Sequence, residues 1–508
     1  MKGRSILFTA FLFLAGWQKT SYAQSVHTDI LRELKITQTL IGNADTLQPV
    51  NAYLIKGKNW NLGLSPIAIN QLYNSDLPIG YNLGSAIAAK GYQVQIAGGI
   101  EANIGRHLHI KLNPEFVSAQ NEDFEQFSQI LGDRVWANYY QFLNTIDLPS
   151  KIVEGPYQKL FPGQSHITYQ FKKFEAGLST ENLWWGPGWK NALVMSYNAP
   201  GFLHASFKTI KPIQTKIGQF SGQWVGGTLA ESGVLPPRIY SAYNGTFLYQ
   251  PKPTDNRFMT GMHLSWQPKW TPDLTIGYSA VSYFYGNDFK SPLDLIPVFN
   301  SGNKASLGAF FASYKLPKEK AEIYLEYGAK SPNFRRAYVA GFRKLFPTKH
   351  DAYIQFAVEL TQMQAQNAEL IRDPNSWYTD AYVQQGYTHW GKTIGAGIGP
   401  GSNSQNIELA WVKGKNKIGF QFERLRHNSD FYYLAFEPIG DYRRHWIDLS
   451  SSANATIDLK HFLIAARVQL TRTYNYQWLV IQTDPNNYFQ PSNEYLNLGG
   501  GLSIMFRL

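Results

Sequence analysis

The most chemically distinctive part of the 508-residue sequence is a cluster of Trp, Gly, Pro, acid and carboxamide residues at 181–202. Its candidate glycan-binding residues are Glu181, Asn182, Trp184, Trp185, Trp189 and Asn198. Sugar rings present C–H faces that lie on aromatic planes, and sugar hydroxyls need acid, amide or guanidinium partners, so this composition suits carbohydrate recognition. The alternative is that the Trp side chains fold inward and fix their own loop, because buried aromatic residues usually serve packing. The sequence leaves both interpretations open.

Signals for catalysis or metal binding are weak. The run Gly-Gln-Ser-His at 163–166 resembles half of a nucleophile elbow, but Ile167 stands where the motif needs Gly. His107 and His109 have the spacing of two neighbours on one strand face, without a clear third ligand beside them. We therefore predict no catalytic residue, no metal site and no cofactor, and expect a protein that is not an enzyme.

Composition excludes several classes of protein. The absence of Cys removes disulfide scaffolds, thiol catalysis and Cys-ligated metals. The formal net charge of +11, together with many aromatic residues, would also fit nucleic acid. A secreted protein rarely meets nucleic acid, so an acidic polysaccharide or lipopolysaccharide phosphate is the favoured anion.

Residues 1–23 have the pattern of a secretory signal peptide. Lys2 and Arg4 precede a short apolar stretch, and Ser21-Tyr22-Ala23 provides small residues for cleavage. No later stretch is apolar enough over about 18 residues to predict a transmembrane helix. The remaining classes are a soluble periplasmic protein, a secreted protein and an outer-membrane β-barrel.

From about residue 91 onward the sequence alternates with the period of β-strands. In 320–330, for example, Ile323, Leu325 and Tyr327 share one face, opposite Glu322 and Glu326. The predicted strands are 91–104, 106–118, 166–178, 202–210, 213–225, 257–267, 273–285, 306–316, 320–330, 336–346, 351–363, 377–388, 391–399, 404–413, 416–427, 445–457, 460–474 and 495–507. Many reach about 10–13 residues, the length of a tilted membrane-spanning strand rather than of a sandwich strand. The acidic residues on the second face fit a polar pore wall.

The connections favour a barrel in the outer membrane. If the first predicted strand runs outward, alternate connections such as 317–319 and 414–415 are tight, whereas 226–256 and 428–444 on the other side are long. Short periplasmic turns and long external loops characterise bacterial outer-membrane barrels. We therefore predict an all-β fold, an 18-stranded antiparallel outer-membrane β-barrel of a Gram-negative bacterium with a small periplasmic helical plug.

Two segments do not fit the strand pattern. Residues 119–165 contain apolar residues at helical spacing, and we predict a helix at about 120–145 that caps the periplasmic mouth. Residues 24–90 precede the predicted barrel, and we predict a helix at 30–41 and an irregular or lumen-filling stretch at 60–90. The predicted organisation is a signal peptide (1–23), an N-terminal periplasmic or lumenal segment (24–90) and a β-barrel (91–508) with a helical insertion at about 119–165.

The segment ENLWWGPGWKNALVMSYNAPGF at 181–202 resembles the Wzi capsule assembly family in its Bacteroidetes-type form. Shorter pieces support it at 91–93, 98–99, 114–116 and 162–165, so the resemblance covers about 90–230. It implies an 18-stranded outer-membrane barrel with helices at its periplasmic end. It also implies a lectin-like role in attaching capsular polysaccharide at the cell surface, without catalysis.

The leading hypothesis is a surface protein that binds capsular or extracellular polysaccharide. The alternatives are a saccharide-permeable porin and, with less support, an outer-membrane hydrolase. The expected partners are the polysaccharide, outer-membrane lipid or lipopolysaccharide, and the barrel assembly machinery during biogenesis, with no nucleic acid.

Overall fold

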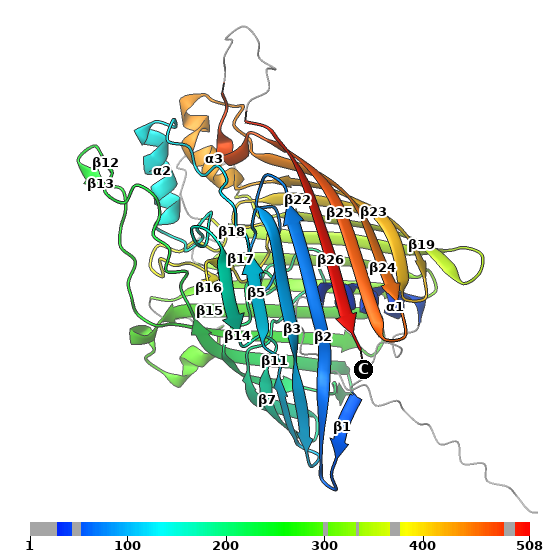
Figure 1. Cartoon of the computed structure of the whole chain (residues 1–508). Helices are drawn as coiled ribbons and strands as arrows, with labels where there is room; N and C mark the ends of the chain where they lie inside the picture. Colours follow the sequence, from blue (N-terminus) through cyan, green and yellow to red (C-terminus); the bar gives the residue numbers. More distant parts are fainter. Residues whose placement is uncertain are drawn as a thin grey trace, which may run out of the picture.

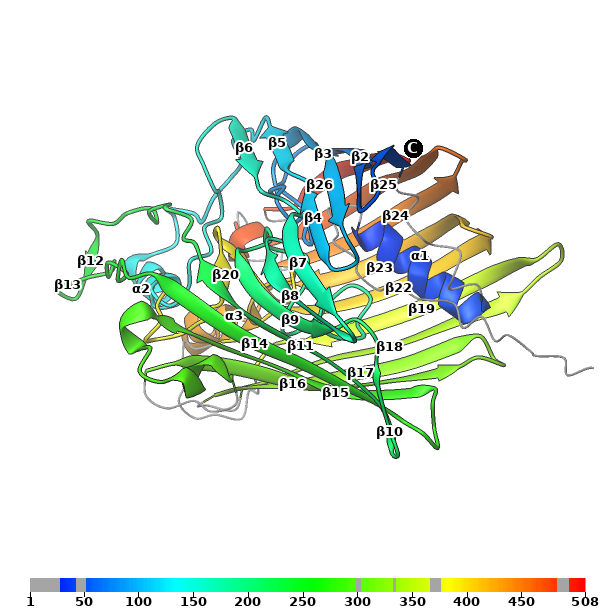
Figure 2. The same cartoon turned by 90° about the horizontal axis from the view of Figure 1, so that it is seen from below.

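The computed structural model describes residues 28–42, 52–297, 303–331, 335–365, 376–481 and 493–507. Its main feature is a closed antiparallel barrel of 18 strands (Figures 1 and 2). The wall consists of β2 (Trp60–Asn74), β3 (Gly91–Ile104), β4 (Leu108–Leu112), β5 (Glu115–Ala119), β6 (Tyr157–Phe161), β7 (His166–Phe171), β8 (Phe174–Ser179), β9 (His204–Thr209), β10 (Ile213–Thr215), β11 (Gly218–Leu229), β14 (Arg257–Pro268), β15 (Leu274–Tyr285), β16 (Ala305–Leu316), β17 (Ala321–Ser331), β18 (Arg335–Pro347), β19 (Ala352–Gln362), β22 (Asn403–Lys413), β23 (Asn416–Arg426), β24 (Ile447–Asp458), β25 (Phe462–Tyr474) and β26 (Tyr495–Phe506).

Other elements lie at the ends of the barrel or inside it. They include α1 (Thr28–Ile41), β1 (Ala52–Lys56), α2 (Asp133–Leu143), β12 (Ala242–Tyr243), β13 (Thr246–Phe247), β20 (Thr388–His389), β21 (Lys392–Thr393) and α3 (Ser429–Ala435). Some wall positions are filled by two short strands in succession: β4 and β5 both pair with β3, and β9 and β10 both pair with β11. The barrel closes where β26 pairs with β2.

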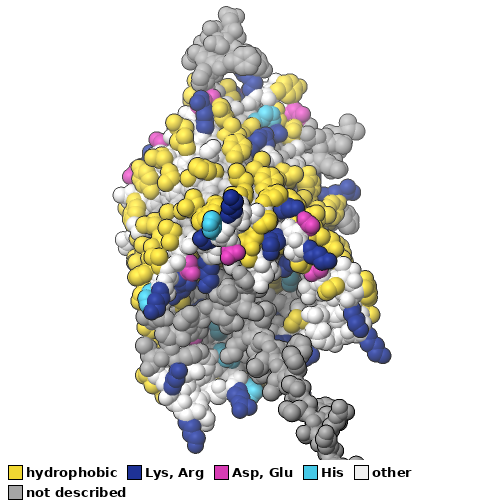
Figure 3. All heavy atoms as spheres, turned by 90° about the vertical axis from the view of Figure 1, so that its right-hand side faces the viewer, with side chains coloured by type: hydrophobic (Ala, Val, Ile, Leu, Met, Phe, Trp, Pro, Cys, Tyr) yellow, Lys and Arg dark blue, Asp and Glu magenta, His cyan; other side chains and the backbone are white. Residues whose placement is uncertain are grey.

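The wall strands alternate between an apolar outer face and a polar inner face, which confirms the pattern predicted from the sequence. On β22, the side chains of Ile407, Leu409 and Trp411 are exposed, whereas Asn406 and Glu408 are buried in the lumen. Hydrophobic side chains form large areas of the face seen in Figure 3. Such an apolar exterior is stable against lipid hydrocarbon, since the paired strands leave no open edge.

The two ends of the barrel differ in the length of their connections. Short turns join β16 to β17, β22 to β23 and β24 to β25, and the C-terminal strand ends on the same side. Long connections, such as 230–256 and 427–446, lie at the opposite end. We call the short-turn end the periplasmic mouth and the long-loop end the outer mouth.

The interpretation of 60–90 as irregular or lumen-filling chain was wrong for 60–74, because β2 is a full wall strand between β3 and β26. Its register shifts between Ser65 and Ala68, so the buried positions change from Gly63 and Ser65 to Ala68 and Asn70. A bulge of this kind reverses the phase of the alternation. No single two-residue alternation of apolar and polar residues spans the whole strand, so the sequence pattern did not indicate β2.

Two predicted wall strands were also wrong. Residues 377–388 and 391–399 lie inside the barrel as a loop that carries the short hairpin β20–β21. Most of their side chains are buried, because the loop contacts the rest of the lumen rather than lipid. The predicted strand 166–178 is a hairpin, β7 and β8, which turns at Lys172 with φ of 52°. The strand 106–118 is divided into β4 and β5.

The helix predicted at 120–145 exists as α2, but its predicted position at the periplasmic mouth was wrong. Its Tyr139 packs on Phe431 of α3, with ring centroids 5.4 Å apart, and α3 belongs to an outer loop. Figure 1 shows α2 and α3 at the end of the barrel opposite α1. Because the additional strand β2 precedes β3, β3 runs toward the periplasm and not outward as predicted, and β4 and β5 are reversed in the same way. The predicted strand 166–178 is in fact two strands, β7 and β8, so all wall strands from β8 onward run in the predicted direction.

The helix at the periplasmic mouth is α1, which agrees with the helix predicted at 30–41. Its Leu34 packs with Leu463 and Met505 near the C-terminal end of the wall. Its Gln38 donates a hydrogen bond of 2.6 Å to the carbonyl oxygen of Gly414, in the turn between β22 and β23. Figure 2 shows α1 crossing this mouth. No helix in the described ranges combines the length and apolarity needed to cross a bilayer.

Candidate functional site

Two loops fill the lumen. We call residues 180–203, between β8 and β9, the Trp loop, and residues 376–402, before β22, the Tyr loop. Together they supply much of a buried apolar cluster inside the wall, to which α2 and α3 also contribute. This cluster is the core of the protein, because the apolar outer face of the wall is turned away from it.

Hydrogen bonds from buried tyrosines join the two loops. The hydroxyl of Tyr378 donates to the carbonyl oxygen of Leu193 at 2.7 Å, and that of Tyr387 donates to Val194 at 2.9 Å. Both tyrosines are fully buried, so these bonds are protected from water. The two loops therefore form one packed body within the barrel.

Carboxylates on the wall anchor the Trp loop. Glu359 of β19 accepts hydrogen bonds from the backbone nitrogens of Trp189, Lys190 and Asn191, the last two at 3.0 and 2.9 Å. Glu326 of β17 accepts from the backbone nitrogen of Leu193 at 3.1 Å. The sequence pattern predicts a polar pore wall from inward carboxylates such as Glu326, whereas in the structure Glu326 and Glu359 bind a loop.

Helix α1 contacts the same loop from the periplasmic side. Arg32 donates hydrogen bonds to the carbonyl oxygens of Gly188, at 2.8 Å, and Trp189, and its guanidinium lies 3.7 Å from the ring centroid of Trp184. A further ion pair joins Glu33 to Lys417 of β23. Burial raises the pKa of Glu33, but Lys417, together with other nearby cations, lowers it to about 2.

Four of the predicted site residues line one small cavity of about 220 Å³: Glu181, Asn182, Trp184 and Trp185. Trp185 is 2% exposed and donates from its indole to Gln223 at 3.1 Å. Asn182 donates through its amide to the carbonyl oxygen of Ala199 at 2.7 Å. These partners lie within the protein, so the arrangement favours a packing role for this part of the Trp loop.

The two remaining predicted residues lie elsewhere. Trp189 is 3% exposed and lines neither this cavity nor the larger one described below. Asn198 is also buried, and its amide donates to the carbonyl oxygen and hydroxyl of Thr393, both at 2.9 Å. Asn198 lines the larger cavity. The structure thus separates the six residues into three environments.

A larger cavity of about 460 Å³ lies between the two loops and the inner faces of β2, β3 and β23–β26. Segments from the outer mouth also line it, including residues 77–83 and 476–478. Its polar and aromatic lining includes Tyr81, Lys190, Lys392, Glu423, His427, Trp446, Asp448, Arg467, Gln469 and Tyr476. This volume is in the range of small-ligand sites.

These cavity residues are not among the site residues predicted from the sequence. The predicted strands already placed Arg467 and Gln469 opposite the outward row Ala466, Val468 and Leu470. An Arg on the inner face of a barrel strand was therefore the one feature of the sequence that could have indicated a binding site in the lumen. Its neighbours in the cavity come from loops whose path through the lumen the sequence does not indicate.

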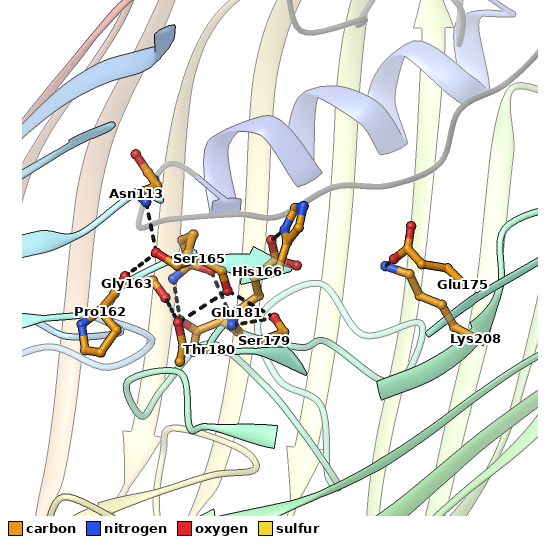
Figure 4. A network of polar contacts seen from close by, with 12 residues as sticks. Asn113, Pro162, Gly163, Ser165, His166, Glu175, Ser179, Thr180, Glu181 and Lys208 are labelled. Atoms are coloured by element: carbon orange, nitrogen blue, oxygen red, sulfur yellow. Dashed lines mark hydrogen bonds and ion pairs between the residues drawn. The ribbon is translucent and has the colours of Figure 1, made fainter. Parts of the chain in front are cut away.

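The residues of the weak elbow motif do not form a nucleophile–base pair. The hydroxyl of Ser165 donates to the carbonyl oxygen of Pro162 at 2.6 Å and accepts from the backbone nitrogen of Asn113 at 2.9 Å (Figure 4). The adjacent His166 instead contacts Glu181 through Nδ1. Burial raises the pKa of the Glu181 carboxyl, but the hydrogen bond and charge of His166, with nearby lysines, lower it more, and the net pKa lies below its usual value.

The predicted histidine pair has other partners. Nδ1 of His107 lies 2.7 Å from the carbonyl oxygen of Gln170, and Nδ1 of His109 contacts the side-chain oxygen of Asn103. Within the described ranges, no three His, Cys, Asp or Glu side chains gather in a way that could hold a metal ion.

The family model described as capsule assembly protein Wzi matches residues 86–482, more than half of the chain. A solved structure of Wzi from Escherichia coli, described as an outer membrane protein involved in group 1 capsule assembly and as a carbohydrate-binding β-barrel, is 11% identical. The alignment covers 95% of this chain and 92% of that one, with a TM-score of 0.60, which shows a common fold.

Other barrels are less similar. OprB from Pseudomonas putida is 13% identical over 88% of this chain and 94% of its own, with a TM-score of 0.40. OccAB1 from Acinetobacter baumannii is 9% identical over 90% and 99%, with a TM-score of 0.43. None of the curated proteins gives a significant match. The barrel is that of a Gram-negative outer-membrane protein, and the chain belongs to the capsule assembly protein Wzi family.

Proposed function

We propose that this barrel binds capsular or extracellular polysaccharide and keeps it attached at the cell surface without modifying it. The observation that carries the proposal is the 460 Å³ cavity, which combines charged, amide and aromatic side chains and is lined in part by outer-mouth segments. Amide and charged groups suit sugar hydroxyls, and aromatic rings suit the C–H faces of a sugar. The carbohydrate binding described for the Escherichia coli structure of the same fold supports this choice.

The six residues predicted from the sequence enter the proposal in two roles. Asn198 contributes directly to the larger cavity. Glu181, Asn182, Trp184 and Trp185 border the smaller cavity and, with the buried Trp189, maintain the shape of the Trp loop. A repeating polymer would gain affinity by engaging cavity and outer mouth through successive sugar units. Outer-membrane lipid or lipopolysaccharide and the barrel assembly machinery remain proposed partners.

A saccharide-permeable porin is the second candidate. An 18-stranded wall is wide enough for an aqueous channel, but the Trp loop and the Tyr loop occupy the lumen, and α1 crosses its periplasmic mouth. Their packing favours binding over diffusion. Liposome swelling in sugar solutions distinguishes the two, because a porin would admit small sugars at a steady rate.

The binding function is tested in cells by deleting the gene and measuring cell-attached and released polysaccharide separately. The proposal predicts a shift from attached to released polymer at unchanged total synthesis. Complementation with the wild-type gene should restore attachment. Unchanged attachment in the deletion strain contradicts the proposed function, and turnover of polysaccharide fragments by the purified protein contradicts its non-enzymatic part.

A further inference from the structure

The larger cavity is lined by two cations that form no ion pair with a carboxylate of the described residues. Arg467 of β25 lines the cavity, its Nε is buried without an acceptor, and its guanidinium forms no ion pair with any described residue. The ammonium of Lys190 lies 4.4 Å from the ring centroid of Trp189, and it too has no ion pair among the described residues. Both side chains are partly buried, so each loses some hydration, and no ion pair with a described carboxylate compensates for that loss.

The carboxylates that line the cavity already have donors. Glu423 accepts a hydrogen bond of 2.6 Å from the hydroxyl of Tyr81 and one of 3.2 Å from the amide of Asn406. Asp448 contacts Nε2 of His427 at 2.8 Å. Neither carboxylate forms an ion pair with Arg467 or Lys190, so both cations are available to a ligand.

The two cations also influence each other. Burial lowers the pKa of Lys190, and the positive charge of Arg467 adds to this effect, whereas the carboxylates of Glu33, Glu408 and Glu423 oppose it. The third cation of the lining, Lys392, differs because it donates to the carbonyl oxygens of Gly84 and Ala86, both at 2.8 Å. An anion between Arg467 and Lys190 would relieve their mutual repulsion.

The shape of the cavity suits a sugar ring. Gly499 and Gly501 of β26 form part of its wall and leave space that side chains would occupy. A Cβ atom at Gly501 would come 3.3 Å from Leu72, so a large side chain there would project into the cavity beside a flexible neighbour. Tyr81 and Trp446 add aromatic surface to the same space.

We propose that this cavity binds an anionic sugar unit of the polysaccharide, with the acidic group placed between Arg467 and Lys190. The inference rests on the proposed function and adds the chemical class of the bound sugar. Arg provides a planar pair of donors for a carboxylate or a phosphate, and Lys provides a second positive charge. Uncharged sugar units would leave both cations unneutralised and bind more weakly.

The test compares two probes with the same rings and different charge. Binding of tetragalacturonate and of its fully methyl-esterified form is measured by calorimetry with the purified full-length barrel in neutral detergent. The wild-type protein should bind the acid form at least about tenfold more tightly, as expected for charged hydrogen bonds. Glucose 6-phosphate, used as a competitor, distinguishes a site for phosphate from one for carboxylate, since only a phosphate-accepting site is blocked by it.

Arg467→Met and Lys190→Met should each weaken acid binding by about tenfold and leave ester binding nearly unchanged. Lys216→Met is the matched control, because it removes the same charge from an exposed periplasmic turn. Gly501→Phe fills the cavity without changing charge and should weaken both probes. Assembly of each variant is checked by its electrophoretic mobility with and without heating.

Equal affinity of the wild-type protein for the two probes overturns the anionic subsite, as does a loss of acid binding that is the same in Lys216→Met as in Arg467→Met. If the protein nevertheless binds the polysaccharide of its own strain, the proposed function survives that result. Failure to bind that polysaccharide overturns the function itself, so the two failures are distinguishable.

Discussion

Glu359→Gln should release the Trp loop from the barrel wall while leaving the wall intact. The Glu359 carboxylate accepts hydrogen bonds from the backbone nitrogens of Trp189, Lys190 and Asn191 and from the hydroxyl of Tyr324, the last at 2.8 Å. All of these donors point at two oxygen atoms on one buried side chain. No other described wall residue contacts three consecutive backbone nitrogens of this loop.

The expected loss follows from the number of acceptors. A Gln side chain retains one oxygen, and its NH₂ group cannot accept, so about half of the hydrogen bonds disappear. Each hydrogen bond to a charged group contributes about 1.5–3 kcal/mol, so docking of the loop weakens by roughly 3–6 kcal/mol. This change corresponds to an opening that is about 10²–10⁴ times more frequent.

Hydrogen exchange followed by mass spectrometry over 186–195 measures the opening directly, and single-channel conductance in planar bilayers reports whether the lumen becomes permeable. Glu322→Gln is the control, because its carboxylate lies on the same inner wall and accepts from Ser313 at 2.7 Å rather than from the loop. Exchange over 186–195 that is equally slow in both variants would refute the anchoring role of Glu359.

Three further predictions concern α1, Lys392 and the Trp pair. Arg32→Ala removes two hydrogen bonds and the contact with Trp184, so the docking of α1 should weaken by about 2–4 kcal/mol. Limited proteolysis measures the detachment of α1, and resistance to cleavage within 28–41 that equals that of the wild-type protein contradicts the prediction. Burial lowers the pKa of Lys392 from 10.5 to about 7, so between these values its side chain binds more protons in the unfolded chain, and Lys392 should contribute an increase in the free energy of unfolding from about pH 7 to 10.5. Denaturant titrations at pH 7 and 9.5 measure this contribution, which Lys392→Met should remove. A difference in the free energy of unfolding between the two pH values that is the same in the variant and the wild-type protein argues against the prediction. Trp184→Ala plus Trp185→Ala should leave the barrel assembled but lower polysaccharide retention, and failure to assemble would identify the pair as structural.

The wall could largely be predicted from the sequence because lipid and lumen impose a strict alternation on long strands. The prediction worked best for 257–363 and from 404 onward, where strands such as β17 and β22 are regular. The predicted number of strands is right although two of its members are not. The count of 18 is right because two errors cancel: 377–388 and 391–399 are not wall strands, whereas β2 was omitted and the predicted strand 166–178 is two strands, β7 and β8.

The contents of the lumen could be predicted only in part. Packing of the Trp loop was one of two interpretations of its composition, and the burial of Trp185 and Trp189 favours it. The larger cavity was not predictable, because Lys190 and Arg467 come together only through the path of a loop inside the closed barrel. Local periodicity carries no information about such a path.

The central claim is that a barrel with a filled lumen binds surface polysaccharide. Its most direct test is binding of the strain's own purified polysaccharide to the full-length protein, immobilised in detergent and measured by surface plasmon resonance. We expect saturable binding that soluble polysaccharide displaces. Absence of binding, together with steady conductance of the same preparation in planar bilayers, would contradict the account and identify the protein as a channel.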